Sequence, residues 1–96
     1  MIVSFGNPAT SDFFHGVSSS RARRIPNQIK EAALCKLDVL NAAQSLDDLK
    51  SPPGNRLELL RGDFAGFHSI RINKQWRIVF RWQDSGAHDV QILDYH

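Results

Sequence analysis

The chain contains a single cysteine, Cys35, among its 96 residues. One thiol cannot form an internal disulfide, and the helical pattern around Cys35 has no histidine at a ligand-like spacing. We therefore expect a buried or half-buried structural thiol, with a redox or nucleophilic role as the less favoured alternative. The four histidines show no metal-ligand spacing, and there is no phosphate-cradling glycine loop or nucleophile elbow. The sequence therefore predicts no bound metal and no cofactor.

Long apolar runs are also missing. No segment approaches the roughly 20 apolar residues that a membrane-spanning helix needs, and residues 1–5 lack the basic flank of a signal peptide. We expect a cytoplasmic protein without a membrane partner. A length of 96 residues fits one domain over 1–96, large enough to bury a core without metals or disulfides.

Basic residues only slightly outnumber acidic residues. The formal net charge of +2 barely indicates a nucleic-acid partner, so the distribution of arginine is more informative. The planar guanidinium matches two phosphate oxygens and stays charged. Arginines cluster once in the first half and recur through the second: Arg21, Arg23 and Arg24, then Arg56, Arg61, Arg71, Arg77 and Arg81. These predict phosphate contacts, with solvated surface charge as the alternative.

The first half of the chain has helical patterning. Thr10 or Ser11 is a candidate cap for a short helix that ends at Gly16. Between Pro26 and about Gln44, apolar residues recur at helical spacing: Ile29, Ala33, Leu37, Leu40 and Ala43. This pattern predicts the main amphipathic helix. Lys36 falls inside its apolar arc, where we expect the ammonium to reach water.

Beyond the proline-rich loop at 51–55 the period changes to two. Residues 2–5 and 57–61 are candidate short strands, and longer alternating runs follow. One side of these runs is strongly apolar, and the other carries Ser69, Arg71, Arg77, Arg81 and Gln91. The sequence predicts an α+β fold, an antiparallel meander whose apolar face is covered by the N-terminal helices. The arginine face is then open to a polyanion.

The chain closes on Asp94, Tyr95 and His96. Metal-free RNA cleavage needs a base for the ribose 2′-hydroxyl, cations for the phosphoryl oxygens and an acid for the leaving 5′-oxygen. His96 is the leading acid or base because imidazole exchanges protons near neutral pH, and Asp94 can orient it. Tyr95 can stack on a nucleobase or touch the phosphate, and alternation places it on the side of Arg77.

Each of these residues has a structural alternative. A C-terminal histidine is more often disordered than catalytic, Asp94 can merely finish a strand, and Tyr95 can close the core. Glu58 is as consistent with a general base as with a surface partner for Arg56. His68 falls on the apolar side of its run, which favours a core or edge histidine over a functional one.

An ordered series of motifs resembles the HigB toxins of the RelE/ParE superfamily. The motifs are the runs 49–58, 60–63, 69–73 and 75–78, followed by the terminal Asp94-Tyr95-His96. They cover the second half of the chain almost continuously, and residues 2–5 fit the family's start. The series is specific, although no single motif is.

The resemblance implies a type II toxin that enters the ribosomal A site and cuts messenger RNA. It also implies a helix-turn-helix HigA-type antitoxin, and a complex of the two that binds operator DNA. Arg61 and Arg77 match basic positions that contact or stabilise the scissile phosphate, and residues 94–96 match the terminal functional group. Glu58 stands where some members have histidine, which leaves the identity of the general base open.

Two other functions fit the same residues. A ParE-type toxin would poison DNA gyrase by protein contact and would need no proton-transfer group. A non-toxic basic module would bind RNA in a salt-sensitive manner without cutting it.

Overall fold

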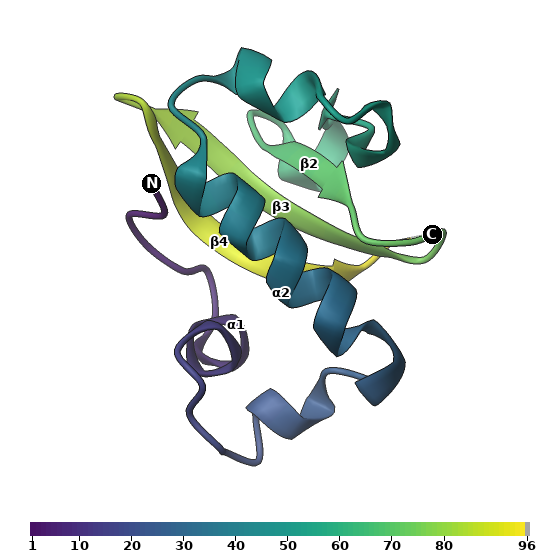
Figure 1. The fold of residues 1–96 in the computed structure, drawn as a ribbon. Coiled ribbons are helices and arrows are strands. Elements are labelled where there is room, and N and C mark those ends of the chain that lie inside the picture. The colour runs from purple at the N-terminus through teal and green to yellow at the C-terminus, as the bar shows by residue number, and fades with distance from the viewer. Residues whose placement is uncertain (96) are drawn as a thin grey trace.

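An antiparallel sheet forms the centre of the computed structural model, which describes residues 1–95. Its four strands follow the order β1-β2-β3-β4. They are β1 (Glu58–Leu59), β2 (His68–Arg71), β3 (Trp76–Gln83) and β4 (Gly86–Asp94). Helix α2 (Asn27–Ala42) crosses one face of the sheet, and α1 (Pro8–Phe14) packs beside β4 (Figure 1). The α+β meander with N-terminal helices on one face is confirmed.

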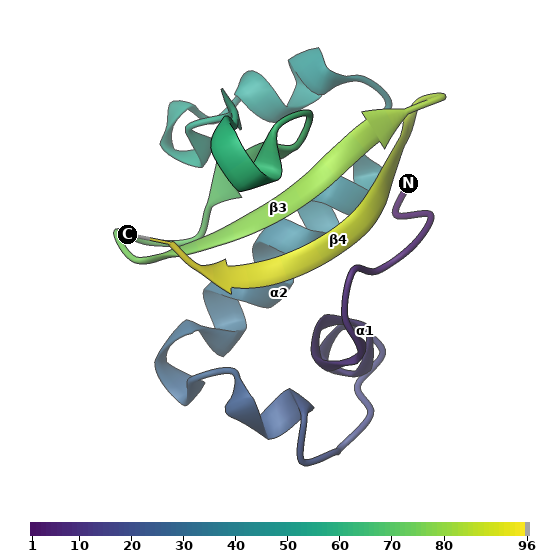
Figure 2. The same ribbon diagram turned by 180° about the vertical axis from the view of Figure 1, so that it is seen from behind.

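The hydrophobic core lies between α2 and the sheet. The predicted apolar stripe of the helix is buried throughout, from Ile29 to Ala43. It meets the inward-facing side chains Ile70, Ile78 and Phe80, all of which are fully buried. The face of β3 and β4 turned away from α2 is not covered by a helix of the described chain (Figure 2). Alternation therefore separates a face packed against α2 from a more accessible face that carries Arg77, as predicted, although Ser69 and Val79 on the second face are also fully buried.

The β3–β4 hairpin is closed by Asp84 and Ser85, which both have positive φ, of 51° and 60°. A two-residue turn of this kind matches the twist of the paired strands. The register shifts between Val79 and Arg81, and the bulge on β4 includes Asp89 with φ 54°. Beyond this bulge, Arg77 lies opposite Leu93, on the face turned away from α2.

The N-terminal segment differs from its prediction in two respects. Residues 2–5 do not form a full strand but make isolated parallel bridges to β4, Ile2 with Ala87 and Phe5 with Val90. The cap of α1 is neither Thr10 nor Ser11. Asn7 caps the helix, because its side-chain oxygen accepts from the Thr10 backbone N–H at 2.9 Å and Pro8 starts the first turn.

Helix α2 corrects two further expectations. Cys35 is exposed, because a position two residues from Ala33 is turned about 200° away from the buried stripe. The Lys36 ammonium does not simply reach water but donates to Oδ1 of the buried Asn55. Asn55 in turn donates to the backbone oxygens of Leu49 and Ser51, so it joins α2 to the loop that precedes β1.

Strand β1 is shorter than the predicted run 57–61, since only residues 58 and 59 pair with β2. The chain leaves the sheet at Leu60 and enters a short 3-10 turn, η4 (Gly62–Phe64). Gly62 and Gly66 bracket this turn with φ of 67° and 89°, a conformation that favours glycine. Within residues 1–95, no helix has both the length and the apolar character needed to cross a membrane.

Candidate active site

Arg77 lies on the accessible face of the sheet, near the end at which β3 begins. It lies opposite Arg71 on β2 and Leu93 on β4. Its Nη1 donates to Ser69 Oγ at 3.0 Å, and its Nη2 lies 3.2 Å from Glu58 Oε1. The side chain is only 15% exposed, so the guanidinium is held in place and partly shielded from water. A fixed, partly desolvated cation of this kind binds a phosphate oxygen more strongly than a mobile surface arginine.

Tyr95 covers another side of the same guanidinium. The Arg77 Cζ atom lies 5.4 Å from the centroid of the phenol ring, within the range of a cation–π contact. The Tyr95 backbone N–H donates to the carbonyl oxygen of Gln75 at 2.7 Å, which extends the β3–β4 pairing beyond the end of β4. The prediction that Tyr95 lies beside Arg77 is confirmed.

Glu58 pairs with a residue that the sequence did not indicate. Its carboxylate forms an ion pair with Arg77, and not with Arg56, the surface partner that was one of its two alternatives. The reason is the register of the sheet: Glu58 lies opposite Ser69, which brings it to the same face as Arg77. The Glu58 side chain is 50% exposed, so the carboxylate is open to solvent and to a ligand.

The remaining arginines differ in how far their charge is already balanced. Arg81 is paired with Asp89 at 2.9 Å and lies 5.7 Å from the centroid of the Phe67 ring. Arg71 Nε donates to the backbone oxygen of Asn73 at 3.0 Å. Arg56 and Arg61 are exposed, and neither forms an ion pair with another residue of the range 1–95. These two are the better candidates for contacts with an incoming phosphate.

The terminal group is only partly described. Asp94 ends β4 opposite Trp76, and its Oδ2 accepts from Gln75 Nε2 at 3.1 Å. Since the neighbouring pair Arg77 and Leu93 defines the accessible face, Asp94 belongs to the other side of the sheet end. His96 lies outside the described residues, so the convergence of His96 with Arg77 stays a prediction.

His68 packs where the sequence predicted, against the core. Its ring stacks on Phe80 with the centroids 6.1 Å apart, and its Nδ1 is buried without a hydrogen-bond partner in the described chain. Burial lowers the pKa of His68 below its ordinary value of 6.5 because the charged form loses hydration. Among residues 1–95, no three His, Cys, Asp or Glu side chains are grouped so that they could hold a metal ion.

Ser69 has a role that the sequence did not reveal. Alternation placed it on the polar face, but only the structure shows that its fully buried hydroxyl accepts from Arg77. In the sequence, Ser69 is recognisable only as a small polar residue on the same side of its strand as Arg71. Together, Ser69, Glu58 and Tyr95 fix a guanidinium beside a carboxylate and a phenol, which suits a phosphodiester.

The family of the chain follows from its sequence relatives. The sequence model of the HigB-like toxin family, described as RelE-like toxin of type II toxin-antitoxin system HigB, matches residues 4–96. The chain belongs to this HigB-like family. Toxin HigB-1 of Vibrio cholerae is 42% identical over 87 residues, which cover 91% of this chain and 90% of the relative. Endoribonuclease HigB of Proteus vulgaris is 29% identical over 97 residues, with both chains fully covered.

Solved structures support the same fold for this HigB-like toxin. A variant of YafQ from Escherichia coli superposes with a TM-score of 0.62 at 11% identity, over 98% of this chain and 93% of the other. YoeB in the YoeB–YefM complex from Staphylococcus aureus gives 0.60 at 16% identity, over 100% and 98% of the two chains. The resemblance inferred from the motifs is therefore confirmed, and the chain is a toxin of a type II toxin-antitoxin system.

Proposed function

We propose that this HigB-like toxin is an endoribonuclease that cleaves messenger RNA on the ribosome, in the cytoplasm, without a metal ion. The observation that carries the proposal is the contact set of Arg77: one hydroxyl, one carboxylate and one phenol ring around a partly shielded guanidinium. Membership of the HigB-like toxin family and the 29% identical endoribonuclease HigB support it.

Each group of the site has a role in the cleavage of RNA. The ribose 2′-oxygen attacks the neighbouring phosphorus and loses its proton to Glu58, the P–O5′ bond breaks, and His96 protonates the leaving 5′-oxygen. The products are a 2′,3′-cyclic phosphate and a 5′-hydroxyl. Arg77 and Arg61 stabilise the charge that develops on the phosphoryl oxygens. Asp94 orients His96, and Tyr95 stacks on a base or contacts the phosphate.

Binding of RNA changes the Glu58–Arg77 pair. A phosphate that approaches Arg77 Nη2 meets the Glu58 carboxylate 3.2 Å from that atom. The two negative groups repel each other when both contact the same guanidinium, so the phosphate replaces the carboxylate as the partner of Arg77 and the carboxylate turns away from it. The half-exposed carboxylate is then free to accept the proton of the 2′-hydroxyl.

The surrounding arginines guide the RNA backbone to this point. Arg56 and Arg71 provide phosphate contacts beside the site, and Arg81 contributes less because Asp89 already balances its charge. The partner that silences the toxin is a helix-turn-helix antitoxin of the HigA type. The toxin-antitoxin complex binds operator DNA through that antitoxin.

Cleavage of a defined messenger RNA tests the proposal. Purified toxin is added to ribosomes that are stalled with a known codon in the A site, and new 5′ ends are mapped by primer extension. We expect ends within that codon and none on the same messenger without ribosomes. Inhibition of gyrase supercoiling without any new ends would contradict the proposal in favour of a ParE-type mechanism. Salt-sensitive RNA binding without new ends would contradict it in favour of a non-cutting RNA-binding module.

A further inference from the structure

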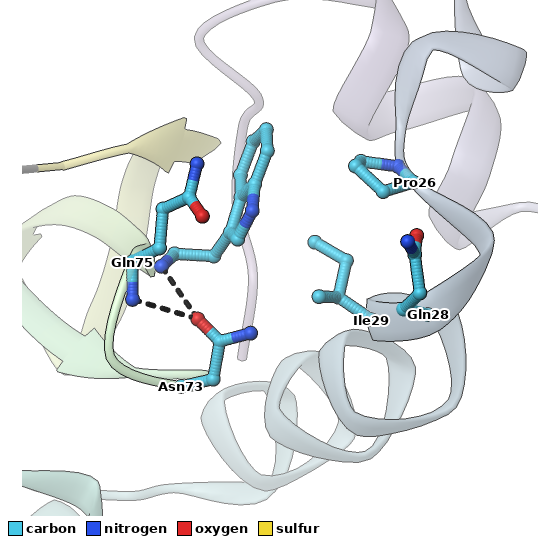
Figure 3. A pocket seen from close by; sticks show the side chains of 6 residues that line it. Pro26, Gln28, Ile29, Asn73 and Gln75 are labelled. Carbon is cyan, nitrogen blue, oxygen red and sulfur yellow. Dashed lines mark hydrogen bonds between the residues drawn. The ribbon is translucent and has the colours of Figure 1, made fainter.

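A pocket of about 240 Å³ opens on the α2 side of the sheet, at the end of the sheet that carries Tyr95. Its walls come from the start of α2 and from the turn between β2 and β3. Six residues line it: Pro26, Gln28, Ile29, Asn73, Gln75 and Trp76. Figure 3 shows Pro26, Gln28 and Ile29 on one side of the pocket and Asn73 and Gln75 on the other. None of the lining residues is charged.

The amide groups of the pocket are presented in a defined orientation. Asn73 Oδ1 accepts from the backbone N–H groups of Gln75 and Trp76, each at 2.8 Å, which leaves Nδ2 as a donor. Gln75 Nε2 donates to Asp94, which leaves Oε1 as an acceptor. The Gln28 amide makes no hydrogen bond with any other residue in 1–95 and offers both functions. The pocket thus presents a donor, an acceptor and one adaptable amide.

These features match a nucleobase. A base is flat, uncharged and carries donors and acceptors along its edge, and an indole ring provides a stacking surface for it. The volume lies below the range of about 300 to 1,000 Å³ that drug-sized ligands occupy, which suits a single ring system. An apolar side chain from a protein partner fits the pocket less well, because it would offer no hydrogen bond to Asn73 Nδ2, Gln75 Oε1 or the Gln28 amide.

We propose that this pocket binds one base of the RNA strand whose phosphate contacts Arg77, an inference that rests on the proposed function. Trp76 and Arg77 are consecutive in β3 and point to opposite faces. The pocket and the phosphate site therefore lie on the two sides of the same sheet end. An RNA strand that passes around the β2–β3 turn places a flanking base in the pocket.

Base-by-base deletion in a short RNA tests this inference. The probe is a single-stranded hexaribonucleotide made uncleavable by 2′-O-methyl groups, with a matched set in which one base at a time is replaced by an abasic unit. Binding to the full-length toxin is followed by fluorescence in a Trp82→Phe background, where Trp76 is the remaining tryptophan. Anisotropy of labelled RNA with the unaltered tryptophans provides the same affinities if Trp82→Phe disturbs folding.

We expect the intact probe to quench Trp76. Loss of the base at one position should abolish the quenching and weaken binding roughly fivefold or more, with smaller effects elsewhere. Gln28→Ala should weaken binding of the intact probe about threefold, whereas Gln44→Ala, an exposed glutamine just beyond α2, should not.

Equal affinity for every abasic probe, or no response of Trp76, would overturn the inference. A response of Trp76 to the antitoxin but not to RNA would overturn it as well. Ribosome-dependent cleavage is measured on the same preparations. Base-dependent quenching in a toxin that does not cleave would support base binding in the pocket and contradict the proposed nuclease activity. Cleavage without any base dependence of binding would support the nuclease activity and contradict base binding in the pocket.

Discussion

Arg77 Nη2 and Glu58 Oε1 lie 3.2 Å apart, although 19 positions separate the two residues in the sequence. The pair brings the proposed general base next to the cation proposed to hold the phosphate. Exposed ion pairs contribute little to stability, typically about 0 to 1 kcal/mol, and the Glu58 side of this one is half-exposed. Its importance therefore lies in the site, where it sets the position of both groups before RNA arrives.

Replacement of the Glu58 carboxylate separates its role as a general base from its role as the ion-pair partner of Arg77. Glu58→Gln keeps the side-chain length but cannot accept the 2′-hydroxyl proton. We expect single-turnover cleavage on the ribosome to fall by about 100-fold or more. RNA binding should not weaken, because a negative charge next to the phosphate is removed. Glu31→Gln, on the exposed side of α2, is the matched control. An unchanged cleavage rate in Glu58→Gln would show that Glu58 is a partner of Arg77 and not the general base.

Ser69 tests whether Arg77 needs to be held. In Ser69→Ala, the guanidinium loses the acceptor that its Nη1 uses at 3.0 Å. We expect cleavage to fall about threefold to tenfold, since Arg77 remains charged but is less well fixed. Far-ultraviolet circular dichroism should remain unchanged, and Ser20→Ala, at an exposed position, serves as the control. A cleavage rate equal to that of the parent chain would show that Ser69 is not needed to position Arg77.

The two faces of the sheet were predictable because alternation depends on each residue and its neighbours alone. Ile70, Ile78 and Phe80 are buried and Arg77 lies on the accessible side, as the period of two requires. The stripe of α2 was predictable for the same reason. The placement of Tyr95 beside Arg77 also followed, because β3 and β4 form a tight hairpin that fixes their register.

What the sequence left open depends on pairing between distant segments. Glu58 meets Arg77 through β2, so the contact required the register of two strand pairs at once. Asn55 meets Lys36 across the gap between a loop and a helix. The bridges of residues 2–5 to β4 join the two ends of the chain. No local pattern encodes any of these contacts.

Asn55 is expected to stabilise the whole loop before β1. Its buried amide donates to the backbone oxygens of Leu49 and Ser51 and accepts from Lys36. Asn55→Ala leaves these groups without partners and should lower the free energy of unfolding by about 2 kcal/mol. Urea unfolding measures the change. Asn27→Ala, at the exposed start of α2, should change stability little, and an equal effect of both substitutions would contradict this role of Asn55.

His68 should make stability depend on pH. Its pKa is lowered in the folded chain by burial, so the unfolded chain binds the proton first as the pH falls. Above the unfolded pKa of 6.5 both states are neutral and the contribution is complete. It is lost as the pH falls through the lowered pKa of the folded chain.

His68→Phe, which keeps the stacking on Phe80 but cannot titrate, should show a smaller loss of unfolding free energy between about pH 8 and about pH 5. An identical loss in the parent chain and in the variant would show that His68 is not responsible.

The most direct test of the account compares two arginines on the same strand. In single-turnover cleavage of ribosome-bound messenger RNA, Arg77→Ala should reduce the rate by about 100-fold or more. Arg81→Ala removes a guanidinium already paired with Asp89 and should change the rate by less than about threefold. Equal rates for the two variants, or full cleavage by Arg77→Ala, would contradict the claim that Arg77 binds the scissile phosphate.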